Sequence, residues 1–357
     1  MLVAKAATAS CATNERPEIV DPTQYPGWDD LVAVHPQGAF FHTACWARVL
    51  AQTYGHRPVY VCRLGDGRIR ELLPIMEVAS VLTGRRGVSL PFTDYCPLIS
   101  LGKGCAELLN AAVEEGRRRD WRSLELRGHV DSWSDEAPSL VFHGHIVELA
   151  HGRDYLFRHL NEGMRRGIRK ARKAGLNVEF SRRGEAVREF YELHCKTRKR
   201  HGLPPQPIRF FDNIGRCVIE RGLGTVAIAR QARKVIAGAV FFHFNTEVIY
   251  KFGASDHRFQ ALRPNNLLMW EAIQHYAEAG FSRLHLGRTS PTREGLRRFK
   301  LGLGGREETL EYRTYDFRKA AFVNRIDRSE SWMNHVFRCL PQPVLRLAGE
   351  WLYPHLS

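Results

Sequence analysis

The sequence contains no run of about 18 apolar residues, and we therefore expect no transmembrane helix. Its longest apolar stretch, from Val235 to Phe244, includes His243. The first residues have no long apolar segment of the kind found in secretory signals. We therefore expect residues 1–26 to form a flexible leader and the protein to stay in the cytoplasm, with contact at the inner face of the membrane as an added hypothesis.

Familiar metal, redox and nucleophile motifs are also missing. The eight cysteines include no CxxC pair and no spacing typical of a disulfide framework, so we expect reduced thiols, several of them in cores. His143 and His145 would share one face of a strand, but no neighbouring Cys or carboxylate partners complete a site, and we predict no metal. The absence of HExxH, Walker A and GxSxG patterns argues against metalloprotease, P-loop and α/β-hydrolase chemistry.

What the sequence does contain is one order of elements twice. In the first copy the strand-like "PVYVCRL", a glycine turn and "RIRELLPIMEV", which reads as one strand, precede "GVSLPF", a helix-like stretch at 105–119 and "RSLELRG". The order recurs from Thr225, about 165 residues later, with a helix expected at 264–279. An apolar-aromatic helix precedes each copy, and a further strand follows each, "LVFHGHIVEL" and "ETLEYRTYDF".

Two copies predict two similar α/β domains with mixed sheets, packed together around a cleft where ligands commonly bind. The length fits two domains at roughly 150 residues each, with extensions. We place the N-terminal domain at 27–150, a basic helical connector at 151–200, the C-terminal domain at 201–318 and a C-terminal helical extension at 319–357.

The second copy has the core order of the GNAT acyltransferase fold, in which three strands in a meander precede a helix and another strand. In that fold the strands flanking the helix splay apart and the acyl donor enters the gap. Here these strands would be "EVIYKFGAS" and "SRLHLGRTS". Pro264 suits the first turn of the helix, and Gly280 follows its end. The intervening run "GASDHRFQALRPNN" is long enough to be a binding loop.

A longer resemblance supports this interpretation. The run "YKFGASDHRFQALRPNNLLMWEAIQHYAEAGFSRLHLGRTSPTREGLRRFKLGLGG" closely resembles the C-terminal half of FemAB-like and BioF-like proteins. The runs "FFHTACWARVLAQTYGHRP", "SLPFTDYCPL" and "RRGIRKARKAGLNVEF" resemble the N-terminal part and the connecting helix of the same group. The resemblance covers about residues 27–318. It implies tandem duplicated GNAT domains and an acyl or aminoacyl transferase, of a group linked to peptidoglycan bridges and exopolysaccharide gene clusters.

The resemblance implies acyl-CoA or aminoacyl-tRNA as co-substrate and no tightly bound cofactor. Bridge enzymes that use aminoacyl-tRNA usually carry a long helical arm, whereas 153–200 leaves room only for a short one. Acyl-CoA enzymes usually have a glycine-rich loop before the helix, where this chain has Arg263-Pro264-Asn265-Asn266. Backbone amides at the helix start still suit phosphate. The donor therefore stays open.

Three residues are predicted to be catalytic. Lys251 lies on the strand that enters the gap, where its cation would bind phosphate or a carboxylate. Arg288 lies just beyond the opposite strand, and such strand ends are favoured for ligands. Asp94 occupies the corresponding strand end of the first copy, where it would line the acceptor site. The structural alternatives are an exposed strand lysine, an ion pair and a turn-capping carboxylate.

A wider set of residues is predicted to bind substrate. Gly253 would allow the donor to approach the backbone closely, and Arg298 and Lys300 would fix phosphates. A bulge glycine and a solvated basic loop are the structural alternatives. The set comprises Tyr95, Gly253, Ser255, Arg263, Asn265, Asn266, Thr289, Glu294, Arg298 and Lys300.

The predicted chemistry is direct transfer, in which an amine attacks a thioester or aminoacyl-ester carbonyl and backbone N–H groups stabilise the oxyanion. Asp94, Asp256, His285 and Glu294 are candidate bases that the sequence does not rank. We expect an amino-bearing cell-envelope or polysaccharide precursor as the acceptor and no sequence-specific binding of nucleic acid. A tRNA-dependent peptidoglycan-bridge transferase and a non-catalytic scaffold with a degenerate gap are the alternatives.

The charge is concentrated in the connector, since residues 153–200 supply +9 of the net charge of +15. An apolar stripe at helical spacing would face protein while the arginines face solvent; it comprises Leu156, Leu160, Met164, Ile168 and Ala171. The segment is either a solvated linker helix or a surface for tRNA, phosphate or an anionic membrane.

The C-terminal extension also has two interpretations. "FVNRIDRSESWMNHVFRCL", with Ile326, Trp332, Val336 and Leu340, and "PVLRLAGEWLYPHL" each leave an apolar face. These faces would pack on the protein's own domains or contact an anionic membrane as an amphipathic helix.

Overall fold

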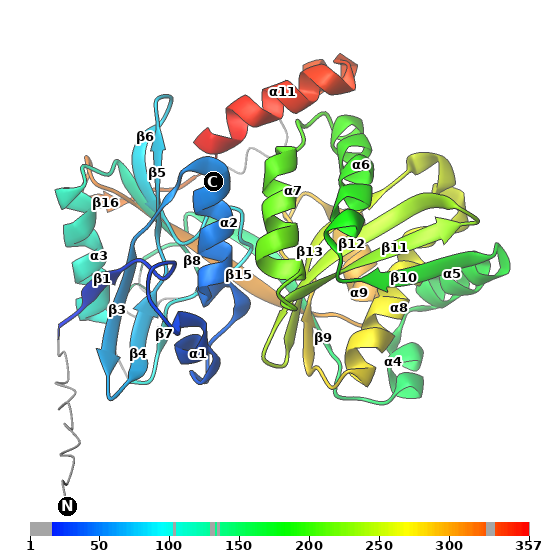
Figure 1. Ribbon diagram of the computed structural model, residues 1–357, viewed down its shortest axis with the longest axis horizontal. Helices are drawn as coiled ribbons and strands as arrows, with labels where there is room; N and C mark the ends of the chain where they lie inside the picture. Colours follow the sequence, from blue (N-terminus) through cyan, green and yellow to red (C-terminus); the bar gives the residue numbers. More distant parts are fainter. Residues whose placement is uncertain (1–15, 103–104, 129–132, 134–135, 326–332, 357) are drawn as a thin grey trace, which may run out of the picture.

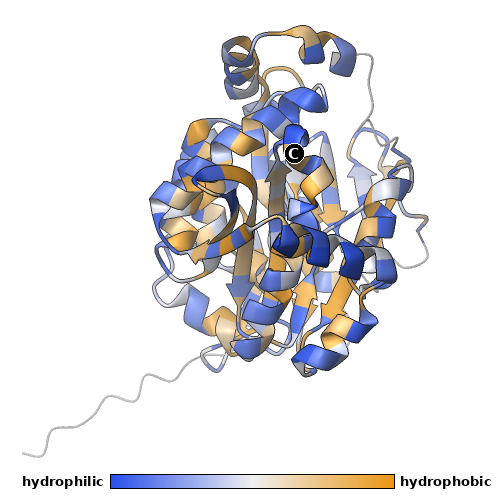
Figure 2. Ribbon diagram, turned by 90° about the vertical axis from the view of Figure 1, so that its right-hand side faces the viewer, coloured by the Kyte–Doolittle hydropathy of each residue, from blue (hydrophilic) through white to orange (hydrophobic). Residues whose placement is uncertain are grey.

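The computed structural model describes residues 16–102, 105–128, 133, 136–325 and 333–356 (Figure 1). Figure 1 shows the N-terminal copy, blue to cyan, beside the C-terminal copy, green to yellow, with strand β15 running between them. In Figure 2 most helices carry both hydrophobic and hydrophilic residues, as expected for helices that cover a sheet. None of the helices in the described ranges combines the length and apolar character needed to cross a bilayer.

The first copy contributes strands to two sheets. One sheet is antiparallel and has the order β1 (Glu18–Val20), β3 (Tyr60–Gly65), β4 (Arg68–Leu73) and β7 (Ile99–Ser100). The run expected as one strand over 68–78 is instead split, because β5 (Met76–Ser80) lies in the larger sheet. Pro74 lies at the break, where a residue without an N–H cannot continue the ladder.

Strand β1 also corrects the expected leader. Residues 1–26 are not all flexible, because Glu18–Val20 pairs in register with Tyr60–Cys62 of β3. The edge of this sheet is thus completed from the N-terminal side. Residues 1–15 lie outside the described part of the chain.

The larger sheet joins both copies into one layer of twelve strands. β16 (Ala321–Phe322) pairs beside β15, off the main path. The other strands follow in the order β10 (Leu176–Ser181), β11 (Gly224–Gln231), β12 (Lys234–Phe244), β13 (Glu247–Ser255), β14 (Arg283–His285), β9 (Leu140–Glu148), β15 (Arg306–Asp316), β8 (Ser123–Arg127), β6 (Gly84–Val88), β5 and β2 (Arg57–Pro58).

The two copies exchange one strand each. β9 follows β8 in the chain but pairs with β14 of the second copy. β15 follows β14 but pairs with β8 of the first copy. β9 and β15 pair with each other in an antiparallel register, from Ile146 and Arg306 to Leu140 and Tyr312. The strands expected after each copy are therefore confirmed, but each completes the sheet of the other copy.

Helices flank both copies as expected. α3 (Ala106–Arg118) and α8 (Pro264–Glu278) match the helices expected at 105–119 and 264–279. α1 (Trp28–Ala33), η1 (Phe40–His42) and α2 (Ala44–Tyr54) precede the first copy, and α7 (Ile208–Ile214) with the π-helical turn η3 (Gly215–Ile219) precedes the second. The rings of Trp46, Phe210 and Phe242 pack together, so one hydrophobic core spans both copies.

The basic segment 151–200 is part of the second unit's packing. It forms α4 (Arg153–His159), α5 (Glu162–Lys173), β10 and α6 (Gly184–Arg200). β10 pairs along its whole length with β11. The predicted apolar stripe is confirmed, because Leu156, Leu160, Met164, Ile168 and Ala171 are all buried in a core shared with α8.

α9 (Glu294–Gly302) follows β14. The last described residues form three short helices, α10 (Met333–Cys339), α11 (Gln342–Leu352) and η5 (Tyr353–His355). Figure 1 shows α11, in red, lying across the top beside α6 and α7. Ile326 and Trp332, expected in an apolar face, lie outside the described residues.

Candidate functional site

The strands β13 and β14 separate at the position expected for the gap. They pair in parallel only over Glu247–Ile249 and Arg283–His285, whereas β13 continues beside β12 as far as Ser255. The register of β12 and β13 shifts between Val240 and Phe241, so that Lys251 is the extra residue of a β-bulge. Bulges redirect side chains and are common beside active sites. The separation and the bulge together open the sheet at Lys251.

Lys251 points from the bulge toward the first copy. Its Nζ donates a hydrogen bond to the carbonyl oxygen of Phe92 at 2.5 Å and lies 3.5 Å from Oδ2 of Asp94. The ammonium also faces the rings of Phe41 and Trp46, at 5.5 and 5.8 Å from their centroids. Only 5% of the side chain is exposed, and this burial lowers the pKa of Lys251, an effect that the Asp94 carboxylate only partly offsets.

Asp94 reaches the gap on a loop of the first copy. The loop follows β6, and two of its non-glycine residues, Leu90 and Phe92, have φ near +54° and +59°. Asp94 lies between Lys251 and Arg288, whose Nε is 3.8 Å from Oδ1. Burial raises the pKa of Asp94, but the charges of Lys251, Arg288 and Lys300 lower it more, so its pKa lies below the ordinary value. Asp94 therefore stays ionised at neutral pH.

Arg288 follows β14 and is held by aromatic rings. Its guanidinium lies over the rings of Phe142 and Tyr312, at 4.5 and 5.4 Å from their centroids. Its Nη1 donates to the Tyr312 hydroxyl at 3.2 Å, and that hydroxyl donates to the backbone oxygen of Asp94 at 2.5 Å. With 37% of its side chain exposed, Arg288 can meet a ligand without leaving these contacts.

Lys300, expected to bind phosphate, has a different set of contacts. It is 3% exposed and donates from α9 to the carbonyl oxygens of Gly287 and Arg288, at 2.7 and 3.0 Å. Burial lowers its pKa to about 8, although Asp94 acts in the opposite direction. Gly287 has φ near +71°, and a Cβ there would lie 3.0 Å from Oδ2 of Asp94. Lys300 thus ties the segment that follows β14 to α9, and Gly287 lets this segment pass close to Asp94.

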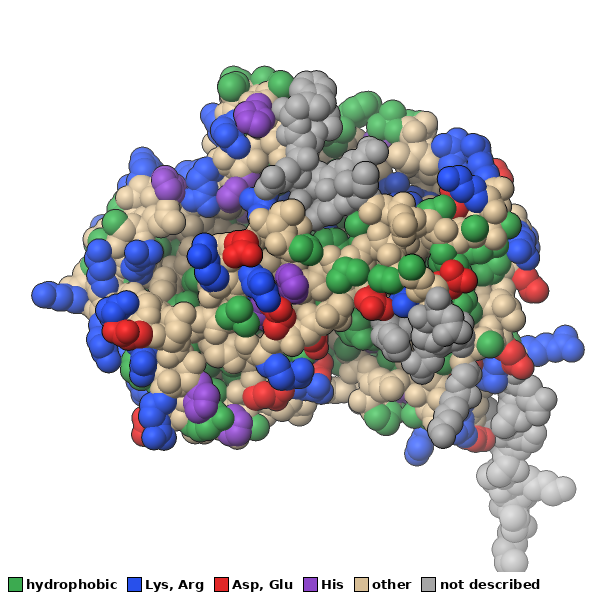
Figure 3. Space-filling model, turned by 180° about the vertical axis from the view of Figure 1, so that it is seen from behind, with side chains coloured by type: hydrophobic (Ala, Val, Ile, Leu, Met, Phe, Trp, Pro, Cys, Tyr) green, Lys and Arg blue, Asp and Glu red, His purple; other side chains and the backbone are tan. Residues whose placement is uncertain are grey.

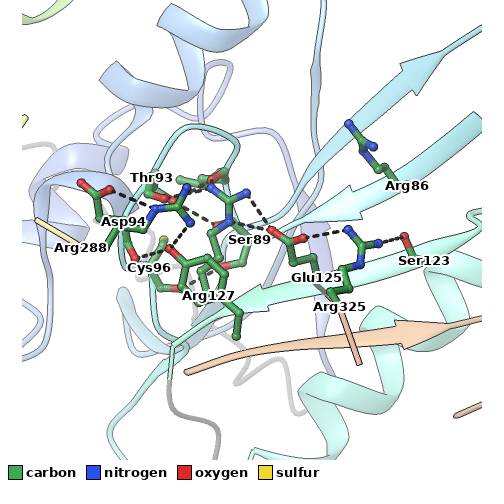
Figure 4. Close-up of polar contacts among 12 residues, drawn as sticks. Arg86, Ser89, Thr93, Asp94, Cys96, Ser123, Glu125, Arg127, Arg288 and Arg325 are labelled. Carbon is green, nitrogen blue, oxygen red and sulfur yellow. Dashed lines mark hydrogen bonds and ion pairs between the residues drawn. The ribbon is translucent and has the colours of Figure 1, made fainter. Parts of the chain in front are cut away.

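A buried ionic chain anchors the Asp94 loop, as Figure 4 shows. Arg127 of β8 donates to the carbonyl oxygens of Thr93 and Leu90, at 2.9 and 3.3 Å, and to Glu125 at 2.8 Å. Arg325 lies on the other side of Glu125, at 3.3 Å. β6 and β8 pair only over two residues, and this loop fills the space beyond them. The first copy's equivalent of the gap is therefore closed by its own chain.

A cavity of about 490 Å³ lies between the two copies and opens onto Asp94. Its walls come from η1 and the Asp94 loop of the first copy, and from β13, β14, β9 and β15. Glu247, Glu308 and Glu311 face it together with the rings of Phe40, Phe41 and Tyr95. Glu247 pairs with Arg283 and lies 3.3 Å from His285. The lining suits a ligand with a ring and an amine. The carboxylates would attract the protonated amine, and the aromatic rings would pack on the apolar face of the ring.

The four candidate bases separate in space. Asp94 and His285 line the cavity. Asp256 caps η4 (His257–Leu262) and forms an ion pair with Arg258, whose hydrogen bond lowers the pKa of Asp256 to about 2. Glu294 is exposed at the start of α9. The structure therefore brings only Asp94 and His285 of this set to the same cavity.

The remaining predicted residues lie at varying distances from the gap. Asn265 donates to Ser255 at 3.3 Å, and Asn266 donates to the sulfur of Met164, which ties the start of α8 to α5. Thr289 is buried and exchanges backbone hydrogen bonds with His143. Arg263 and Arg298 are exposed, Tyr95 lines the cavity, and a Cβ at Gly253 would overlap the Tyr250 hydroxyl at 1.7 Å.

Several residues of the site were not predicted from the sequence. Tyr312 and Phe142, which hold Arg288, come from the exchanged strands β15 and β9, so no local pattern places them there. Glu125 and Arg127 alternate on β8 in a way that also fits an ordinary surface strand. His143 and His145 share one face, as expected, and both lie within 3.3 Å of Glu307. No group of three or more His, Cys, Asp or Glu side chains in the described ranges is arranged to hold a metal ion.

A protein-family model matches most of the second unit. Residues 158–307 match the model described as an acetyltransferase (GNAT) domain. The matched stretch, which is less than half of the chain, includes α5, β10, the divergent strands and α8. Comparison with curated protein sequences finds no match.

Solved structures support the fold over most of the chain. The crystal structure of FemX is 15% identical, with a TM-score of 0.65 over 85% of this chain and 98% of that one. A conserved protein of unknown function from Bacteroides thetaiotaomicron is 12% identical (TM-score 0.55; 83% and 98% covered), and the C-terminal domain of a putative lysylphosphatidylglycerol synthetase from Agrobacterium fabrum is 14% identical (TM-score 0.53; 82% and 91% covered). The resemblance to FemAB-like proteins is thus confirmed at the level of the fold.

Proposed function

We propose that this protein transfers an acyl or aminoacyl group from an activated donor to an amine of a cell-envelope or exopolysaccharide precursor. The observation that carries the proposal is the separation of β13 and β14 where Lys251, Arg288 and Asp94 meet, with the cavity opening onto Asp94. The GNAT domain match supports the reaction class.

The donor carbonyl is assigned to the gap. There the amine nitrogen bonds to the carbonyl carbon, and the bond from that carbon to the donor's sulfur or oxygen breaks. Lys251 and Arg288 supply positive charge for the oxyanion, together with N–H groups on the β13 edge beyond Ile249. Because both cations are already fixed by rings and backbone, little reorganisation is needed as charge develops.

The acceptor is assigned to the cavity between the copies. Asp94 holds the incoming ammonium group, since its lowered pKa favours an ionised, orienting role over that of a base. His285 lines the same cavity and lies beside Glu247, so we assign to it the removal of the proton. In the first copy the Asp94 loop fills the equivalent of the gap, so this copy contributes Asp94 and one wall of the cavity to the reaction.

One observation favours aminoacyl-tRNA as the donor. The outer face of α5 is exposed at Arg166, Arg169, Lys170, Arg172 and Lys173, and α5 packs beside the start of α8. A face of this charge suits nucleic-acid phosphates.

The test begins with the donor. Purified protein is heated with CoA thioesters, with charged tRNA or with neither, because a ligand at 100 times its Kd stabilises by about 2.7 kcal/mol. The donor that stabilises is then offered with amino-bearing envelope precursors, and product is measured by mass spectrometry. If no donor binds and no product forms, the proposal fails, and the alternative of a non-catalytic scaffold is favoured.

A further inference from the structure

The helix α11 has two faces of different character. Leu345 and Gly349 of α11 face inward and are buried, as is Tyr353 of the following η5. A Cβ at Gly349 would lie 2.0 Å from the carbonyl oxygen of Pro205, and the Tyr353 hydroxyl donates to the carbonyl oxygen of Pro204 at 3.1 Å. These contacts fix the rotation of the helix about its axis, so the opposite face is held outward.

The outward face of α11 is apolar. Val344, Leu347 and Trp351 are 44%, 65% and 61% exposed, and their spacing places them in one stripe along the helix. Of the 16 exposed large apolar side chains among the described residues, five lie between positions 336 and 356. We define the C-terminal stripe as the three on α11, Val344, Leu347 and Trp351; Val336 lies on α10, and Leu356 follows η5. Such concentration distinguishes it from singly scattered surface residues.

Cations lie beside the C-terminal stripe. α10 packs on the end of α6, since a Cβ at Gly202 would lie 1.8 Å from the carbonyl oxygen of Asn334. At this junction burial first, and then the charges of Arg200, Arg293, Arg198 and Arg338, lower the pKa of His201. Figure 3 shows hydrophobic side chains along the top edge of the molecule, with Lys, Arg and His side chains below them. From position 333 to 356 the sequence has a single acid, Glu350.

We propose that the C-terminal stripe docks this protein on an anionic phospholipid bilayer. An outward stripe with a Trp, flanked by cations, has the composition of helices that lie in the membrane interface. Anionic headgroups complement the cations of α6 and α10, and the net charge of +15 adds long-range attraction. This inference goes beyond the proposed transfer reaction and does not depend on it.

The docked orientation would bring the mouth of the gap near the lipid headgroups. Arg200 at the end of α6 donates to His257 at 3.3 Å and to His201 at 3.2 Å. His257 begins η4, two residues after β13 ends at Ser255, in the part of the chain where β13 no longer pairs with β14. The cations that flank the C-terminal stripe therefore continue to the open side of the sheet.

The test is co-sedimentation of the full chain with two kinds of vesicle, one of phosphatidylcholine alone and one containing about one-third phosphatidylglycerol. We expect binding to the anionic vesicles that falls with salt. Leu347→Ser with Trp351→Ser should weaken it by roughly tenfold or more. Arg338→Gln with Lys199→Gln should weaken only the anionic component, by roughly tenfold.

A matched control is Val34→Ser, at the end of α1 on the opposite edge in Figure 1, which should bind as the parent protein does. Thermal unfolding by circular dichroism shows whether each variant is folded. Absence of binding to anionic vesicles, or equal binding by the double Ser variant, would overturn the proposal. So would a parent dimer that the Leu347 and Trp351 changes convert to monomer, because the C-terminal stripe would then be an interface between copies.

Discussion

At the residue scale, one carboxylate balances several cations in the candidate site. Asp94 lies within 3.5 Å of Lys251 and 3.8 Å of Arg288, and its loop is the first copy's direct contribution. Replacing it with Asn would keep the shape but leave Lys251 in a buried position without its counter-charge.

We expect Asp94→Asn to lower kcat by roughly a hundredfold or more and to reduce the free energy of unfolding by about 1–3 kcal/mol. Steady-state kinetics on an identified donor and acceptor, with urea unfolding, measure both effects. Asp66→Asn, in an exposed turn, is the control and should change neither. Parent-like kcat in Asp94→Asn would remove Asp94 from the site.

Lys300 gives a prediction about pH. Its pKa is about 8 in the folded protein against an ordinary 10.5, so between these values the unfolded chain holds a proton that the folded protein has released. Stability contributed by this group must therefore rise with pH over that interval. The difference in unfolding free energy between parent and Lys300→Met should grow by on the order of 2–3 kcal/mol from pH 8 to pH 10.

Lys300→Arg is the control, because its guanidinium stays charged throughout the interval. The parent protein should gain the same pH-dependent stability relative to this variant. If the three proteins keep parallel unfolding curves from pH 8 to pH 10, the pKa of Lys300 is not lowered.

Local sequence patterns placed Lys251 and Arg288 at the gap but did not predict the side chains that contact them. Lys251 and Arg288 were placed by the order of strands around α8, and that order depends on nearby sequence. Tyr312 is brought to Arg288 on β15, a strand that leaves the second copy and pairs with β9 and β8. An alternating strand pattern specifies a face and not a partner strand, so this contact could not be predicted.

At the scale of elements, α5 presents a charged surface on a helix fixed by its apolar stripe. Changing Arg165, Arg166, Arg169 and Lys170 to Gln should weaken binding of tRNA and flatten its dependence on salt, since fewer counterions are released. The buried stripe is untouched, so the variant should unfold as the parent protein does. Filter binding of tRNA from about 50 to 200 mM salt gives the two slopes.

A control for charge alone replaces Arg57, Arg68 and Arg85, which are exposed on the first copy. If this control weakens tRNA binding as much as the α5 variant does, the effect is general electrostatics. If neither does, tRNA does not bind at α5, and a donor with few phosphates remains.

Elements with clear end signals were predicted well, and those that depend on distant contacts were not. Pro264 and Gly280 set the ends of α8, and the observed helix ends at Glu278. The run around Pro74 was expected as one strand because apolar residues continue through it, yet the two halves join different sheets. The pairing of each half with distant strands determines which sheet it joins, and Pro74 indicates only the position of the break.

At the scale of the whole molecule, strand exchange makes the two copies interdependent. Separate pieces 1–150 and 151–357 should each lack a central strand neighbour, because β8 would lose β15 and β14 would lose β9. We expect neither piece to unfold cooperatively alone, and the mixed pieces to recover a folded complex. Circular dichroism with size-exclusion chromatography measures this. A monomeric piece with a sharp thermal transition would contradict it.

The exchange also sets an order of events on the ribosome. β8 is complete once Arg127 has been made, but its neighbour β15 begins at Arg306. Until then the nascent chain carries open strand edges at both β8 and β9, and such edges pair readily with other chains. Closure of the sheet must therefore wait for nearly the whole chain. Slow translation would lengthen the period in which two nascent copies can trade strands with each other instead of within one molecule.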